Sequence, residues 1–300
     1  MTRHLPVPLG LVLVSALVAL PGCVDLVGAM DDAKYVDRQE KTFTVTGRPD
    51  VILGTFDGSI EIRPTDKSEV HVVIEKHAAS KEDADKIQIQ AEQTGNRVVV
   101  EVKKPESLGG IHFGWSRSAK LIVSLPASSN VQAHSGDGSI DIERITGTLE
   151  LRSGDGSIRG RDLIGDVKAH TGDGSIKLDD VTGTLDADTG DGSVAIGGKL
   201  SVVRARSGDG SVEVRASAGS AASTGWDITT GDGSITLIVP EGFGGELDAH
   251  SGDGHVALDG VSVSNVTGQI SRNSVKGRLG QGGGPVRLRT GDGSITVKRF

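Results

Sequence analysis

The amino-acid sequence predicts an all-β protein built as a single-stranded parallel β-helix, a solenoid with coils of about 18 residues. The first observation is the segment Ser-Gly-Asp-Gly-Ser-Ile at residues 135–140, which recurs along the second half of the chain. Near-identical copies begin at residues 153, 171, 189, 207, 230, 251 and 290, and a shorter copy lies at 57–60. The second observation is the step between copies, which is 18 residues four times and then 23, 21 and 39. We interpret the last step as two periods plus a small insertion.

Composition also favours a solenoid over a thick sandwich. Phe, Trp and Tyr make up 3% of the chain and Gly accounts for 44 of its 300 residues. A core must therefore be built in thin layers of Ile, Val, Leu and Ala. The net charge is −8, with Lys and Arg interspersed, so no long-range attraction to nucleic acid is expected.

When the copies are aligned, apolar residues fall into columns with period-2 alternation, as in short strands separated by bends. The column after the repeated turn holds Ile140, Ile158, Ile176, Val194, Val212, Ile235, Val256 and Ile295. A third side of each coil is expected at Ile145, Leu163 and Val181. Left-handed β-helices need apolar residues six apart throughout, and these columns do not keep that spacing. We therefore expect a right-handed coil, in a repeat region at 131–300.

Charged columns at 18-residue spacing support parallel stacking. Glu150, Lys168, Asp186 and Arg204 alternate in sign, and stacked residues would lie about 4.8 Å apart, where opposite charges attract. One other fold stays open. Asp-Gly between alternating strands is also a strong hairpin signal, so an antiparallel β meander of Asp-Gly hairpins is the alternative.

Residues 41–130 are expected to form an N-terminal β region that shields the open end of the stack. Ser80, followed by acidic residues, predicts the start of one short helix. The glycine-rich segment 108–115 carries Phe113 and Trp115. We interpret it as a loop folded back as a hydrophobic plug, with a ligand-binding loop as the alternative.

The first residues are typical of a lipoprotein leader. Residues 1–22 contain a basic residue and then an apolar run that is too short to span a bilayer, as in a signal peptide. The run ends in Leu-Pro-Gly-Cys, which resembles a bacterial lipobox and implies cleavage before Cys23 and lipid addition to it. Because Cys23 is the only cysteine, no intrachain disulfide can form. Residues 23–40 are expected to be a lipidated tether.

Stacking would align the turn aspartates in a file. Its expected members are Asp137, Asp155, Asp173, Asp191 and Asp209. We interpret Asp and Gly as supplying a corner with positive φ, with the Asp side chain capping its own turn. The alternative is calcium, because nonapeptide calcium rolls repeat at half of 18. Those rolls need a glycine-aspartate motif in both halves of the coil, and the second half here lacks it, so we expect no metal or other cofactor.

His134, His170 and His250 share a column with Arg152, Arg206 and Arg289, which predicts a mixed, mostly basic file rather than a metal site. No Gly-x-Ser-x-Gly, His-Glu-x-x-His or phosphate-binding loop occurs in the sequence. Every candidate Asp belongs to a repeating turn, so we assign no catalytic residues and expect a protein that is not an enzyme.

The order of several motifs resembles a known family, the bacterial adhesin-like β-strand-repeat proteins of domain of unknown function 4097. The resemblance rests on Asp-Gly-Ser-Ile-Glu-Ile at 57–62, the repeated segment, Ile-Thr-Leu-Ile-Val-Pro at 235–240 and the glycine-rich ending at 282–295. It covers residues 41–300. It implies a β-solenoid at the cell envelope without established catalysis.

These observations predict a non-enzymatic, lipid-anchored envelope protein that acts as a scaffold or adhesin-like binding module. Its partners would be the membrane, through the N-terminal lipid, and an envelope protein or glycan. The alternatives are a calcium-stabilised repeat protein and a polysaccharide-active β-helix enzyme. Val24 follows the cysteine in place of the aspartate associated with inner-membrane retention, so an outer-membrane location is expected if the host has two membranes.

Overall fold

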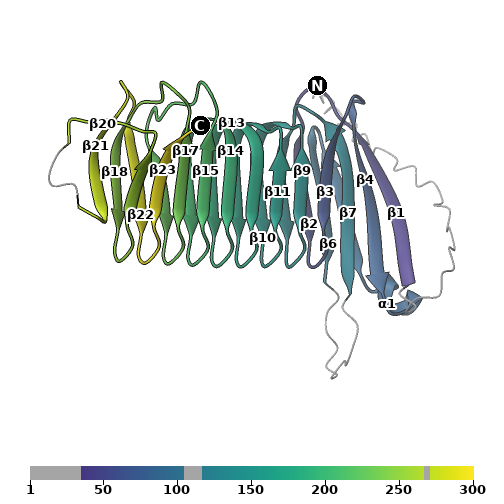
Figure 1. Ribbon diagram of the computed structural model, residues 1–300. Helices are drawn as coiled ribbons and strands as arrows, with labels where there is room; N and C mark the ends of the chain where they lie inside the picture. The colour runs from purple at the N-terminus through teal and green to yellow at the C-terminus, as the bar shows by residue number, and fades with distance from the viewer. Residues whose placement is uncertain (1–34, 105–116, 267–270) are drawn as a thin grey trace, which may run out of the picture.

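The computed structural model describes residues 35–104, 117–266 and 271–300 (Figure 1). The predicted all-β class is confirmed. The strands before the full-length repeats are β1 (Tyr35–Thr44), β2 (Asp50–Thr55), β3 (Ile60–Thr65), β4 (Glu69–Ala78), β5 (Gln88–Thr94), β6 (Arg97–Lys103) and β7 (Ser118–Pro126). The predicted short helix is α1 (Lys81–Asp85), and the Ser80 side chain accepts the backbone N–H of Asp83 as its N-cap.

Sixteen further strands form the repeat region. They are β8 (Asn130–Ser135), β9 (Ile140–Glu143), β10 (Thr146–Ser153), β11 (Ile158–Arg161), β12 (Ile164–Thr171), β13 (Ile176–Thr189), β14 (Val194–Ser207), β15 (Val212–Ala216), β16 (Trp226–Thr230), β17 (Ile235–Val239), β18 (Gly245–Ser251), β19 (Val256–Asp259), β20 (Val263–Ser264), β21 (Ser274–Leu279), β22 (Pro285–Thr290) and β23 (Ile295–Arg299).

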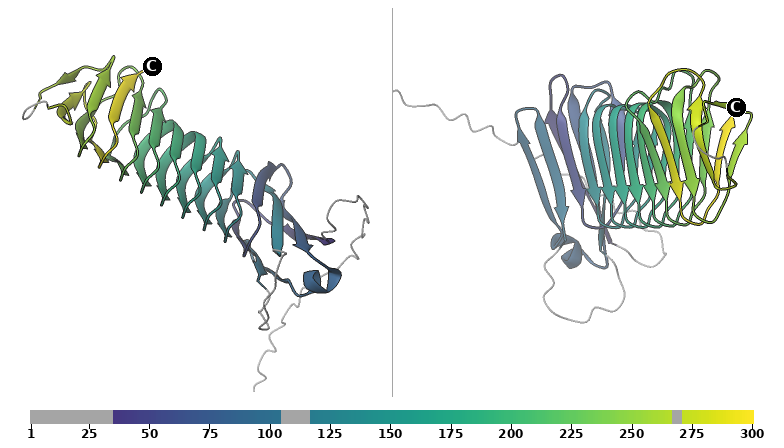
Figure 2. Two further views of the ribbon diagram at one scale, coloured as in Figure 1. Left: turned by 60° about the horizontal axis from the view of Figure 1, so that its bottom comes forward. Right: turned by 90° about the vertical axis from the view of Figure 1, so that its left-hand side faces the viewer.

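The strands pair into two ladders that share the long strands β13 and β14. The first ladder runs β5–β6–β2–β8–β10–β12–β13–β14–β16–β22–β18–β21–β20. The second runs β1–β4–β7–β3–β9–β11–β13–β14–β15–β17–β23–β19. One strand of each ladder makes one rung of an elongated stack (Figure 2).

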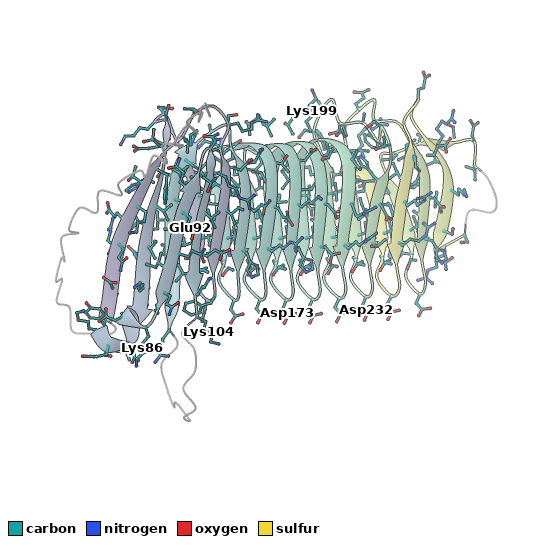
Figure 3. All side chains as sticks on the ribbon, turned by 180° about the vertical axis from the view of Figure 1, so that it is seen from behind. Lys86, Glu92, Lys104, Asp173, Lys199 and Asp232 are labelled. Carbon is teal, nitrogen blue, oxygen red and sulfur yellow. The ribbon has the colours of Figure 1, made fainter. Side chains whose placement is uncertain are left out.

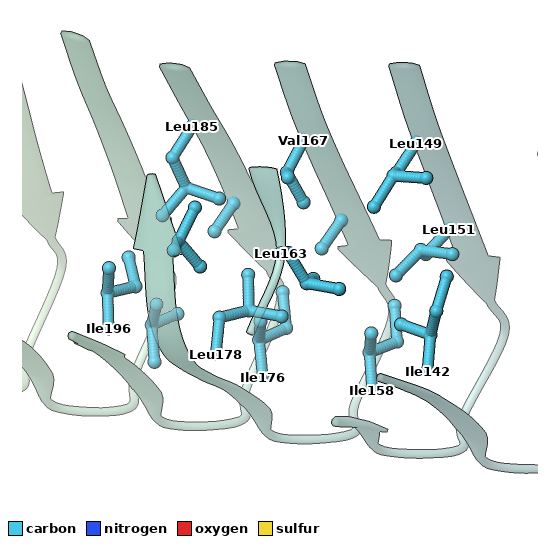
Figure 4. Close-up of a cluster of buried hydrophobic side chains, with 14 of the residues drawn as sticks. Ile142, Leu149, Leu151, Ile158, Leu163, Val167, Ile176, Leu178, Leu185 and Ile196 are labelled. Atoms are coloured by element: carbon cyan, nitrogen blue, oxygen red, sulfur yellow. The ribbon is translucent and has the colours of Figure 1, made fainter. Parts of the chain in front are cut away.

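Successive repeats pair in parallel at the expected 18-residue register, which brings the apolar columns into one core. Ile158 lies between Ile140 and Ile176, and all three are at most 1% exposed. In the other ladder Leu149, Val167 and Leu185 are aligned and buried in the same way. Because side chains alternate across a strand, each ladder turns one apolar face inward, and the two faces share the core (Figure 4).

The sheet as a whole is mixed, so a purely parallel solenoid is too simple. The pairs β1–β4, β4–β7, β5–β6, β18–β21 and β20–β21 are antiparallel. All five lie toward the ends of the stack, where no further repeat is available to continue a parallel ladder. The Asp-Gly turns do not form hairpins either. Strands β8 and β9 flank one of them and pair in different ladders.

The expected third side is a corner. Ile145, Leu163 and Val181 are fully buried beside it, and each follows a residue with φ of 54° to 56°. Those residues are Arg144, Asp162 and Asp180. Asp visits this left-handed conformation more readily than most residues, which suits it to a sharp bend between the two ladders.

The order of the last rungs in space differs from their order in the chain. Strands β22 and β23 lie between the rung of β16 and β17 and the rung of β18 and β19. The 39-residue step is therefore not two coils. It contains β20 and β21, and β21 pairs antiparallel with β18 at the end of the ladder.

The N-terminal end is built in a similar way. Strands β2 and β3 form a rung between β6–β7 and β8–β9, so the ladders already include residues 50–65 and do not start at 131. Residues 35–40, assigned to the tether, lie in β1. Their side chains alternate between half-buried and exposed positions and they pair along β4, so the tether cannot extend to residue 40.

Some predictions fall on residues that the structure does not describe. The leader, Cys23 and the loop residues Phe113 and Trp115 lie outside the described ranges. Within those ranges, no helix is long and apolar enough to cross a membrane.

The Asp-Gly corners need glycine because the backbones of neighbouring rungs lie too close together there to leave room for a Cβ atom. The φ angles of Gly138 and Gly156 lie outside the left-handed region, so the expected positive-φ corner is wrong for these glycines; Gly58, in the shorter copy, does have φ of 136°. A Cβ atom on Gly156 would overlap the backbone carbonyl of Gly138 in the preceding rung. The same overlap recurs at Gly174, Gly192 and later rungs.

We predict that Gly156→Ala lowers the free energy of unfolding by about 1–3 kcal/mol, because the backbone of the neighbouring rung must move. Gly197→Ala is the matched control. Gly197 also lies in the repeats, but a Cβ there would meet no atom within 4 Å. That change should be neutral or slightly stabilising. Thermal denaturation of the two variants checks this, and equal midpoints would show that the corner has room for a side chain.

Candidate functional site

The corners align nine aspartates into one row, which we call the aspartate file. In spatial order its members are Asp57, Asp137, Asp155, Asp173, Asp191, Asp209, Asp232, Asp292 and Asp253. At about 4.8 Å per rung the file extends for about 38 Å. The predicted five-residue file is thus part of a longer one. Asp173 and Asp232 project from the row of corners (Figure 3), and every member except half-buried Asp57 is exposed.

The corner is held by the Ser or Thr before its first glycine, not by the aspartate. At threonine corners the hydroxyl donates to glycine carbonyls of the preceding rung. At serine corners it also accepts an N–H of its own corner, as Ser153 shows. Its Oγ accepts the backbone N–H of Gly156 in its own corner at 3.0 Å and donates to the carbonyl of Gly138 in the preceding rung at 2.9 Å. The equivalent hydroxyl residues are buried in every full copy. They are Ser135, Ser153, Thr171, Thr189, Ser207, Thr230, Ser251 and Thr290.

The prediction that each Asp caps its own turn is therefore wrong. In the described part of the chain, the carboxylates of the eight exposed file members make no hydrogen bond or ion pair. A signal for the true cap was present in the sequence. Ser153 has the same strand parity as the inward-facing Leu149 and Leu151, so its hydroxyl had to point inward, where a polar group needs a partner.

One member of the file differs from the rest. Burial raises the pKa of the Asp57 carboxyl above its ordinary value of 3.8, and the neighbouring Asp137 raises it further, while Lys104 lowers it. The charged form of Asp57 is therefore destabilised in the folded protein, at the point where the file meets the N-terminal region. Its exposed neighbours are surrounded by water, which weakens the repulsion between them.

The outward faces of the strands carry the expected charged columns. Glu150, Lys168, Asp186 and Arg204 are consecutive neighbours in the first ladder. The His and Arg column is also in register, and His170 and Asp188 approach to 3.7 Å in it. These pairs are largely exposed, so each contributes little to stability. Among the described residues, no group of three or more His, Cys, Asp or Glu side chains is arranged to hold a metal ion.

The outward face of β2 departs from this pattern. Where the neighbouring rung carries Gln132 and His134, β2 presents Ile52 and Gly54, and Phe56 follows at the corner. These residues line a depression of about 620 Å³, which we call the outer depression. Its further lining residues include Glu101, Lys103, Lys104, His134 and Arg152.

The outer depression has an apolar floor and a rim with charges of both signs, Lys103, Lys104 and Arg152 lying beside Glu101 and Glu150. Sequence reasoning missed it, because that reasoning searched for charged or catalytic residues and this site depends on the lack of charge at Ile52, Gly54 and Phe56. The available signal was the contrast between these three positions and the matching positions of the other repeats. The aromatic residues proposed for binding, Phe113 and Trp115, lie outside the described residues. Lys104, on the rim, is the last described residue before them.

Taken together, the two ladders, the glycine corners and the outward charged columns define a repeat protein of the β-solenoid type. The Toastrack DUF4097 family model matches residues 53–298, so the chain belongs to this family. The resemblance stated from the motifs is thereby confirmed. No curated protein matches the chain.

Several solved structures are similar over most of their length. A protein from Bacteroides fragilis described as a putative adhesin is 12% identical, with a TM-score of 0.47, and the match covers 88% of this chain and 97% of that one. A protein from Parabacteroides distasonis described as a putative lipid binding protein is 14% identical, with a TM-score of 0.37 and the same coverage. A putative adhesin from Parabacteroides merdae is 12% identical, with a TM-score of 0.32, and the match covers 88% and 96% of the two chains.

The roles of the hydroxyl and the carboxylate can be separated by mutation. Thr171→Val removes the single hydroxyl that the carbonyls of Gly154 and Gly156 share as a donor, and should lower the free energy of unfolding by about 1–3 kcal/mol. Thr171→Ser keeps the hydroxyl and should cost less. Asp173→Asn should change stability by no more than about 0.5 kcal/mol. A larger loss for Asp173→Asn than for Thr171→Val in denaturation experiments would show that the aspartate, not the hydroxyl, holds the corner.

Asp57 gives a pH-dependent prediction. The raised pKa means that folding favours the protonated form of the Asp57 carboxyl. Its contribution to the free energy of unfolding is therefore fully present below the unfolded pKa, near 3.8, and is lost as pH rises through the folded value. Asp57→Asn should therefore raise the thermal midpoint at pH 7, and this gain should shrink toward zero below pH 3.8. Asp173→Asn serves as the exposed control. A gain at pH 7 that persists unchanged at pH 3 would contradict the assignment.

Proposed function

We propose that the protein is a non-catalytic, lipid-anchored module of the cell envelope that binds an envelope protein or glycan at the outer depression. The observation that supports this most directly is the apolar floor of Ile52, Gly54 and Phe56 on a face that is otherwise charged. Fully burying an exposed Ile or Phe side chain contributes about 1.5–3 kcal/mol, and Ile52 and Phe56, which are already half-buried, would contribute part of that each on binding. Aromatic residues, Phe among them, are enriched in the cores of protein interfaces, where a polar rim surrounds them.

The rest of the molecule suits an adhesin-like or scaffolding role. The stack holds the outer depression on four adjoining strands, β6, β2, β8 and β10, so a partner would meet a preformed surface. The exposed charged columns are not needed to hold the fold and remain available for contacts of lower energy around it.

The lipid anchor is supported by the sequence alone. Cleavage before Cys23 and acylation there would attach the chain to the membrane ahead of β1, with an outer-membrane location if the host has two membranes. Cys23→Ser should then release the protein from the membrane fraction. The right-handed sense of the coil likewise stays a prediction.

Calcium binding along the aspartate file is the second candidate function. It is favoured by nine carboxylates in register, eight of them without a protein partner among the described residues. Thermal midpoints in calcium and in chelator distinguish the two cases, and equal midpoints remove calcium as a stabilising ligand. Release of soluble sugars from an envelope polysaccharide would instead identify a glycan-cleaving enzyme.

Photocrosslinking in the native host tests binding at the outer depression. We expect p-benzoylphenylalanine at position 54 to give a crosslinked product in intact cells. The same group at position 206, which is outward in the same column several rungs away, should give at least fivefold less. Introducing Phe56→Ser should reduce the product at position 54.

Mass spectrometry of the digested product identifies the partner class, because the peptide crosslinked at position 54 then carries either a second peptide or a glycan. Equal products from positions 54 and 206, or a product at position 54 that does not respond to Phe56→Ser, would contradict the proposed site.

A further inference from the structure

Strand β1 is the edge of the second ladder at the N-terminal end of the stack (Figure 1). It pairs with β4 along all ten of its residues, and no other strand of the described chain pairs with its opposite side. Such an edge presents unpaired backbone N–H and C=O groups and can accept another strand. Val36 on β1 is also 49% exposed, which is unusual for a large apolar side chain in this protein.

The charges of β1 are arranged symmetrically about Gln39. The order is Asp37, Arg38, Gln39, Glu40, Lys41. If a second β1 ran antiparallel with the two Gln39 residues opposite each other, Arg38 would face Glu40 of the partner subunit and Asp37 would face Lys41 of the partner subunit. Twofold symmetry repeats each contact, which gives four opposite-charge pairs. The flanking residues would place Tyr35 opposite Phe43 of the partner subunit.

This order of charges also selects one register. In a continuous sheet, the core-facing side chains of both β1 strands must point to the same side. Only residues of the same parity can then lie opposite each other, so the residue at the twofold axis changes in whole-residue steps between alternative registers. Centres at residues 37, 38, 40 or 41 would each place a charged residue opposite its own copy, which is unfavourable. Only the centre at Gln39 avoids this over the charged segment. Charges on an edge strand often prevent pairing, but a purely protective edge does not need a self-complementary order.

We propose that two copies of this chain associate through β1, antiparallel and centred on Gln39, so that their second ladders form one continuous sheet. Arg38 and Glu40 are the members open to this contact, because their side chains are 58% and 53% exposed. Their contacts within the chain are with each other at 3.3 Å and, at longer range, with Glu75 (4.0 Å) and His71 (3.8 Å). Asp37 is already held by Lys76 at 3.6 Å and by the side-chain amide of Gln39, so its pairing with Lys41 of the partner subunit adds less than the Arg38 pair. The contact is one strand wide, so the dimer is of the weak, reversible kind. It is independent of binding at the outer depression.

Cysteine crosslinking of the full chain in its host envelope tests the proposal. Gln39→Cys should form a disulfide-linked dimer, because opposed residues of an antiparallel pair lie about 4.5–5.5 Å apart, within disulfide reach. Thr44→Cys is the control on the same strand. It is exposed, but in the proposed dimer it lies far from its own copy. Wild-type chain controls for Cys23, the only native cysteine.

Charge reversal supplies the decisive comparison. In the Gln39→Cys background, Glu40→Arg places arginines opposite each other twice and should reduce crosslinking at least fivefold. Adding Arg38→Glu exchanges the two charges and should restore crosslinking to within twofold. Thermal midpoints of these variants should stay close to that of the parent, because the exposed pair contributes little to the fold.

Sedimentation of the detergent-solubilised full chain with Glu40→Arg alone, and with the exchanged pair, repeats the comparison without an added cysteine. Reversible dimers in the wild-type and exchanged chains, but not in Glu40→Arg, are the expected result. Crosslinking equal to that of Thr44→Cys, no response to Glu40→Arg, or no recovery on exchange would overturn the proposal.

Discussion

The whole stack depends on direct backbone contact between the glycine corners of neighbouring rungs. The N–H of Gly190, for example, donates to the carbonyl oxygen of Gly172 at 2.6 Å, and no Cβ fits between such corners. Buried hydroxyls such as Thr189 Oγ1 then donate to the glycine carbonyls of the preceding rung. This contact fixes the spacing and register of the rungs, and the register in turn aligns the apolar columns, the charged columns and the aspartate file.

Much of the repeat could be predicted because its signals are local and periodic. The 18-residue step identified the columns that contain Ile140, Ile158 and Ile176, and Ser80 identified the helix start. The order of the rungs at the two ends could not be predicted in this way. Strand β22 inserts between β16 and β18 by long-range pairing, and its own sequence matches that of any other repeat, so no local feature reveals its position.

The functional features were harder to predict for a different physical reason. Asp-Gly is a strong turn signal, so the capping role was assigned to the aspartate, while strand parity pointed to the buried hydroxyl. The outer depression depends on small and apolar residues at three outward positions, of which Gly54 is one, and contains no recognisable motif. Both features depend on whether a side chain points into the core or out of the sheet. In the sequence, that direction can be read only by aligning every repeat with the others.

Corner-on-corner stacking and the inserted rung can be tested together by one disulfide measurement. The corner of Asp292 contacts those of Asp232 and Asp253 on its two sides. Paired cysteines at 232 and 292 should therefore oxidise to an intrachain disulfide, whereas cysteines at 232 and 253, two rungs or about 10 Å apart, should not. Efficient crosslinking of 232 with 253 and none of 232 with 292 would show that the rungs follow chain order and would contradict this account.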